Sequence, residues 1–297
     1  MVLKRLTLIF AAGLLASMTA FAQVPIEHSD IFPSAITTKW FGPYAFPVPQ
    51  QLQGQVSPKL RLEVGGDVVI GSLAGADNPD YTYAPTFKIV VPLWTDRVNF
   101  TVWGEMYEWY RDNEAVRQLR RVDPQYDLVG DDAGSTLFSL DVLVLKEGKY
   151  HPSVAARLAT LTATGDHYET ARHYDAPGCF FDISAGKDFA LGSKVSLRAS
   201  ATFGLVVWQT DRGRQNDAWM TGAALSCTGS FWTVSAEMAG YSGWEKSDDA
   251  PVSLRARAEL HFGCFSPYVG YVHGLRDYPF DIFSAGLRVD FDILKQK

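Results

Sequence analysis

Apolar and polar residues alternate along most of the chain after residue 57, which is the period of β-strands rather than of helices. The alternation is clearest in 194–205, 252–262 and 283–293. Counting such segments predicts twelve strands, at 58–72, 82–94, 96–110, 134–146, 152–164, 179–189, 193–208, 217–227, 230–242, 252–263, 265–274 and 281–293. Most have about 10 to 16 residues, enough to cross a membrane when tilted, whereas strands of soluble domains typically have about 5–6.

The links between these strands alternate in length. The predicted tight turns are 95–96, 147–151, 190–192, 228–229 and 264, and between them come longer links at 73–81, 111–133, 165–178, 209–216, 242–251 and 275–280. Outer-membrane barrels have short periplasmic turns and longer outer loops, whereas Greek-key sandwiches have no reason for this order. We therefore predict an all-β fold: a single transmembrane antiparallel up-and-down barrel of about twelve strands with both termini periplasmic.

The N-terminus has the order of features found in an export signal. Lys4 and Arg5 precede an apolar stretch at 6–15, and 20–22 (Ala-Phe-Ala) is a small-x-small cleavage site. We expect a signal peptide at 1–22, cleaved after Ala22, and an outer-membrane location. The proline-rich segment 23–57 is predicted to be irregular; it could line the periplasmic mouth, plug the lumen or form a disordered leader. Residues 58–297 form the predicted barrel.

Composition agrees with this fold without requiring it. The chain is 47% hydrophobic and 13% aromatic, with eight Trp and thirteen Tyr, as expected for strands with one lipid face, but also for a secreted β-sandwich. A net charge of −6 argues against a nucleic-acid partner. Cys179, Cys227 and Cys264 lack metal-type spacing. One disulfide is possible among them, but we expect no disulfide framework and no cofactor.

Several motifs resemble those of uncharacterised outer-membrane β-barrel proteins of Bacteroides-like bacteria. They are Phe-Gly-Pro at 41–43 with Phe-Pro-Val-Pro at 46–49, Val-Asn-Phe-Thr-Val-Trp at 98–103, Arg-His-Tyr-Asp-Ala-Pro-Gly at 172–178, Trp-Gln-Thr-Asp at 208–211 with Asn-Asp at 216–217, and Asp-Tyr-Pro-Phe at 277–280. The resemblance implies the location and the fold, and no activity. The chain departs from the general barrel pattern because Phe291, its last aromatic residue, is followed by a polar tail.

If the apolar faces meet lipid, the polar faces line the lumen, because a charge at the lipid midplane costs about 2–4 kcal/mol. The predicted lumen residues are Arg61, Glu63, Asp67, Lys88, Glu105, Tyr107, Arg198, Glu237, Arg255, Arg257, Glu259, His261, Arg288 and Asp290. These mixed charges could fill a narrow interior, or they could line a passive channel for a small solute. The sequence does not decide between these two alternatives. The expected partners of the outer surface are membrane lipid and lipopolysaccharide.

Two further functions depend on the outer loops. The polar candidates there are His167, Glu169, Arg172, His173, Asp175, Arg212 and Arg214. The histidines suggest a lipid-acting hydrolase, although no G-x-S-x-G motif is present, and His167, Glu169, His173 and Asp175 could hold a metal ion. The two arginines at 212 and 214 could contact lipopolysaccharide phosphates. Loop 111–133 could instead bind a protein partner of unknown identity.

Overall fold

Nearly all of the described chain is β-structure. The computed structural model describes residues 38–93, 95–165, 168–174, 177–210, 214–243 and 250–293, so the predicted signal peptide lies outside the described residues. The strands are β1 (Leu60–Gly71), β2 (Asp80–Pro92), β3 (Val98–Glu105), β4 (Tyr107–Arg111), β5 (Val129–Ala133), β6 (Thr136–Leu145), β7 (Ser153–Leu161), β8 (Gly178–Ala190), β9 (Ser196–Thr210), β10 (Arg214–Thr228), β11 (Trp232–Gly243), β12 (Val252–Leu260), β13 (Phe265–Arg276) and β14 (Phe280–Phe291). The short helices are η1 (Thr38–Trp40), α2 (Glu114–Arg120) and η2 (Tyr168–Thr170).

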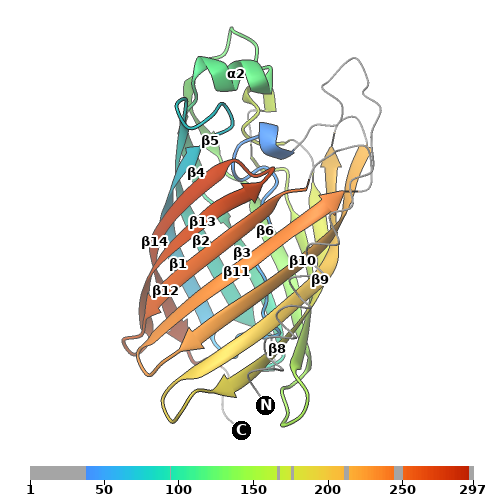
Figure 1. Cartoon of the computed structure of the whole chain (residues 1–297), viewed down its shortest axis with the longest axis vertical. Coiled ribbons are helices and arrows are strands. Elements are labelled where there is room, and N and C mark those ends of the chain that lie inside the picture. Colours follow the sequence, from blue (N-terminus) through green and yellow to red (C-terminus); the bar gives the residue numbers. More distant parts are fainter. Residues whose placement is uncertain are drawn as a thin grey trace.

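These strands close into one antiparallel barrel (Figure 1). Strand β1 pairs with β2 on one side and with β14 on the other, so the sheet has no free edge there. Strands β3 and β4 follow one another along one barrel strand, and β5 and β6 along the next, so fourteen segments make twelve barrel strands. The predicted twelve-stranded barrel is confirmed.

The interruption between β3 and β4 changes which side chains face inward. Glu105 and Glu108 are both buried although they are three residues apart, and Met106 between them is exposed. An extra residue in a strand shifts the two-residue alternation by one position. Gly104, with φ +157°, lies directly before the irregularity, and the neighbouring strand is interrupted at 134–135.

The predicted loop lengths were partly wrong. Link 111–133 contains the end of β4, helix α2 and all of β5, so this hairpin rises beyond its neighbours (Figure 1). Helix α2 begins because the Asn113 side chain accepts a hydrogen bond from the backbone amide of Val116. At the same end, link 277–279 is no longer than the opposite turn at 229–231, because β13 and β14 continue farther than the sequence pattern indicated.

The outer face of the barrel is apolar. Exposed large side chains recur on it from β1 to β14, among them Val64, Leu158, Phe203, Val269 and Phe283. Within the described part of the chain, no helix is long and apolar enough to cross a membrane. The three cysteines are free thiols.

The character of the inward side chains differs from one part of the lumen to another. Near the ends of β1 and β14 that carry Leu60 and Phe291, inward side chains are charged, such as Glu63 and Glu259. Toward the end that carries α2, the inward residues of β9 to β11 are apolar, including Val206, Trp208 and Tyr241. These apolar side chains face the segment 41–55, which lies inside the barrel and leads into β1.

Candidate functional site

The segment 41–55, which we call the plug, fills one side of the lumen with an apolar core. Phe41 and Phe46 contact each other edge to face, with ring centroids 5.4 Å apart. Phe46 also contacts Trp208 of β9 at 5.9 Å, and Trp208 contacts Tyr241 of β11 at 6.3 Å. All four side chains are at least 95% buried. Aromatic burial of this extent is a major stabilising contribution, so the plug is an integral part of the fold.

Hydrogen bonds join the plug to the rest of the barrel at several positions along the barrel axis. Tyr278 donates to the carbonyl of Pro43 at 3.0 Å, and Tyr44 donates to the Asp67 carboxylate at 3.0 Å. Gln51 donates its backbone amide to Glu237 at 3.2 Å. Closer to β1, the Gly54 amide donates to Ser184 Oγ at 2.9 Å. The polar groups that an irregular segment leaves unpaired are thereby satisfied inside the barrel.

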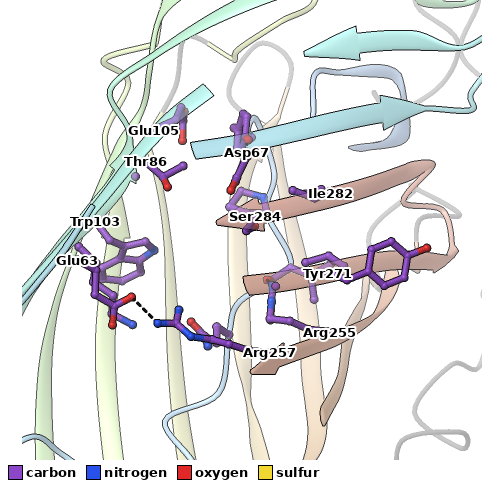
Figure 2. A pocket seen from close by; sticks show the side chains of 18 of the residues that line it. Glu63, Asp67, Thr86, Trp103, Glu105, Arg255, Arg257, Tyr271, Ile282 and Ser284 are labelled. Carbon is purple, nitrogen blue, oxygen red and sulfur yellow. Dashed lines mark hydrogen bonds and ion pairs between the residues drawn. The ribbon is translucent and has the colours of Figure 1, made fainter. Parts of the chain in front are cut away.

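On the opposite side of the lumen the plug leaves space. A cavity of about 240 Å³ lies between Tyr44, Pro47 and Val48 of the plug and the wall formed by β1 to β3 and β12 to β14 (Figure 2). A second cavity of about 610 Å³ continues toward the short-turn end and includes Arg61, Ser139, Asp141 and His261 in its wall. Glu63, Lys88, Arg255 and Arg257 line both cavities, so the two spaces meet at these four charges.

Ion pairs at this meeting point join strands that are not adjacent in the sheet. Arg257 of β12 contacts Glu63 of β1 at 3.1 Å, shown by the dashed line in Figure 2. Its Nε also donates to Glu259 at 2.5 Å, and Arg288 of β14 contacts the same carboxylate. Lys88 lies opposite Glu63 in the β1–β2 register. Both signs of charge are therefore fixed along one wall of the lumen.

Most of the predicted lumen residues line this interior. Arg61 pairs with Asp290 at 2.9 Å across the closing seam, as their register requires. Arg198 donates to the plug carbonyl of Gln53 at 2.9 Å. Those in the walls of the two cavities are Arg61, Glu63, Asp67, Lys88, Glu105, Arg255, Arg257, Glu259, His261 and Arg288.

Tyr107 is different, because it lies on the outer face. The interruption before β4 turns Glu108 inward and Tyr107 outward, where its hydroxyl donates to Asp131.

A second charged cluster closes the end of the lumen that carries α2. Arg172, fully buried, donates to both oxygens of Glu108 at 2.7 and 3.0 Å, to Asp112 at 3.3 Å and to Thr82 at 2.6 Å. Burial opposes the charged form of Arg172, but the carboxylates of Glu108 and Asp112 raise the pKa of this guanidinium above its ordinary value. Arg120 of α2 contacts Asp80 at 3.3 Å and Asp112 at 2.9 Å.

Of the other predicted loop residues, His173 lies in the same cluster as Arg172, since both contact Glu108. His167, Asp175 and Arg212 lie outside the described residues, as does the side chain of Arg214, while Glu169 is exposed. His173 is buried against β4 and β5, with Ser135 Oγ 3.4 Å from its Nδ1 and Asp132 Oδ2 3.9 Å from its Nε2. Ser135 is 3% exposed and His173 1%, so this pair is buried away from solvent.

The sequence offered the apolar motif at 41–49 as a possible plug, and this motif supplies Phe41 and Phe46. It placed Asp132 in an outer loop that could bind a partner, whereas the residue lies buried in the interior. Glu108 is the interior residue that sequence reasoning did not single out. Nothing local marks Glu108 as inward, because the alternation of β3 predicts the opposite face.

Comparison with known proteins identifies the fold. No family model and no curated protein matches the chain. Among solved structures it is similar to the COG4313 outer membrane channel from Pseudomonas putida F1, with a TM-score of 0.54 at 10% identity over 82% of this chain and 100% of that one. It also matches the KdgM porin in complex with disordered oligogalacturonate (TM-score 0.47, 8% identity, 78% and 99% coverage) and LpxR from Salmonella typhimurium (0.46, 12%, 78% and 100%). At 10% identity, the likeness to the first of these structures shows the barrel fold alone.

Proposed function

We propose that the protein is an outer-membrane channel for small polar solutes, closed by its own plug in this conformation. The single observation that carries the proposal is the pair of adjoining cavities between the plug and the wall of β1 to β3 and β12 to β14. A barrel that served only as a scaffold would gain stability by filling this volume, since each unfilled space forfeits packing contacts. The similarity to a barrel described as a channel agrees with the proposal.

The chemistry of the lining suggests which solutes pass. Glu63 contacts Arg257 and lies opposite Lys88 in the β1–β2 register, and Arg255 lines the same cavity. Because fixed charges of both signs line the cavity, we expect no strong preference for cations over anions. The same charges suit solutes that carry both a hydrogen-bond donor group and a hydrogen-bond acceptor group. Trp103 and Tyr268 add flat apolar surface in the same cavity. Small zwitterionic or hydroxylated molecules fit this combination.

Planar-bilayer recordings test the proposal. The unmodified protein and the double variant Phe41→Ala with Phe46→Ala should both insert, and the variant should show more frequent current steps because its plug loses aromatic contacts. Folding of each sample is checked by the heat-dependent mobility of the barrel in SDS gels. Absence of stepwise current from both folded proteins, together with no solute uptake by liposomes that contain them, would refute a channel and favour a structural barrel.

A further inference from the structure

His173, Glu108 and Asp132 come together from three separate segments at the closed end of the lumen. Glu108 belongs to β4, Asp132 to the adjacent β5, and His173 to the loop before β8. His173 Nε2 lies 3.7 Å from Glu108 Oε1 and 3.9 Å from Asp132 Oδ2. One donor atom from each of the three residues lies within 4.8 Å of the others, and all three residues are at most 2% exposed.

These spacings are too long for direct hydrogen bonds, which join N and O at about 2.7–3.2 Å. They fit a shared ion better. Zinc binds imidazole nitrogen and carboxylate oxygen at about 2.0–2.2 Å, which separates tetrahedral ligands by about 3.4 Å. Closing the two His173 gaps to that value needs shifts of about half an ångström or less, and the donor atoms of Glu108 and Asp132, within 4.8 Å of each other, would approach by at most about 1.4 Å.

The balance of charge around the three residues also favours a cation. In the described part of the chain, carboxylates from Asp80, Glu105, Glu108, Asp112 and Asp132 gather at this end around two guanidinium groups, from Arg120 and Arg172. A divalent cation would add positive charge beside these acids while Arg172 continues to bind Glu108.

The ring of His173 is oriented as a metal ligand requires. Its Nδ1 faces Ser135 Oγ at 3.4 Å and Glu105 Oε1 at 3.9 Å. With the ring proton on Nδ1, directed at these acceptors, the Nε2 lone pair points toward Glu108 and Asp132. Ligating histidines commonly use their second nitrogen in this way. Gly165 makes the arrangement possible, since a Cβ at that position would lie 2.4 Å from the His173 ring.

From this geometry we infer a buried divalent transition-metal site, formed by Glu108, Asp132 and His173, that ties the loop between β7 and β8 to the β4–β5 hairpin. A nitrogen with two carboxylates selects an ion of the zinc, cobalt or manganese class over calcium, which prefers oxygen ligands alone. The bound ion would have a structural role, because the site is buried and joins segments that are far apart in the sequence.

Zinc binding to the purified full-length protein tests this inference. After removal of metal with a chelator and dialysis, the protein should retain one equivalent of added zinc through desalting. Asp132→Asn and His173→Ala should each lower the affinity by at least 100-fold. Ser135→Ala should lower it by about 10–100-fold, as expected for a residue that positions a ligand. Cobalt in place of zinc should give visible absorption bands that the metal-free protein lacks.

The matched control is His273→Ala. His273 contacts Asp281 at 2.7 Å on the exposed side of β13, so it reports adventitious surface binding and should leave the single equivalent intact. Asp132→Asn preserves the side-chain volume, so it tests the site even if His173→Ala fails to fold. The inference is overturned if the folded unmodified protein retains no zinc, or if folded Asp132→Asn and His173→Ala both retain a full equivalent.

Discussion

Substitution of Glu237 by Gln should loosen the plug without disturbing the barrel. Glu237 is 4% exposed and accepts hydrogen bonds from the backbone amide of Gln51 and from Arg255. The substituted amide keeps the volume but offers one acceptor oxygen. The Gln51 amide donates to both Glu237 oxygens, at 3.3 Å to Oε1 and 3.2 Å to Oε2. We expect the amide oxygen to keep the place of Oε1 beside Arg255 Nη1, 2.6 Å away, so the Gln51 amide loses its shorter bond and keeps the longer one, shared with Arg255.

The expected shift in the plug equilibrium depends on which contacts of residue 237 differ between the conformation with the plug in place and the conformation with the plug displaced. The contact between Arg255 and residue 237 joins two wall strands, so it exists with the plug in place or displaced and cancels between the two states. Only the bond to Gln51 distinguishes them. A hydrogen bond to a charged group contributes about 1.5–3 kcal/mol, and at 3.2 Å the lower value applies. About 1.5 kcal/mol corresponds to a roughly tenfold shift toward the displaced plug.

Single-channel recording measures this shift as the fraction of time in the conducting state. Glu259→Gln is the matched control, because it removes the same charge from the lumen, while Glu259 contacts Arg257 and Arg288 rather than the plug. We expect Glu237→Gln to raise the open fraction about tenfold at unchanged step size, and Glu259→Gln to alter step size alone. An equal increase in both variants would show that lumen charge, and not the anchoring of the plug, controls opening.

Three further predictions concern stability, measured by urea unfolding in detergent. Phe203→Arg puts a charge on the lipid face, where Phe203 is 56% exposed, and should cost about 2–4 kcal/mol; the same change at Tyr150, in a turn, should cost under about 1 kcal/mol. Arg157→Met should cost about 3–5 kcal/mol because it leaves Asp182, 2.6 Å away, buried and unpaired, and adding Asp182→Leu should restore much of that loss. Trp208→Ala should cost about 3–5 kcal/mol, and a smaller value would mean that the plug collapses into the space.

The sequence alone determined the features that depend on local periodicity. A two-residue repeat places alternate side chains on opposite faces wherever a strand is continuous. The segments around Arg198, Arg257 and Arg288 could therefore be assigned to strands, and their polar sides to the interior. The closing pair of Arg61 and Asp290 also followed, because the first and last strands of a barrel must meet.

Only the tertiary structure decided what depends on contact between distant segments. One extra residue between β3 and β4 turned Glu108 inward and Tyr107 outward, and no local preference marks that position. Phe46 meets Trp208 although 162 positions separate them, because the plug enters the lumen before β1 begins. His173 joins Glu108 and Asp132 for the same reason: neighbours across a barrel are set by the register and closure of the sheet, which short-range alternation does not encode.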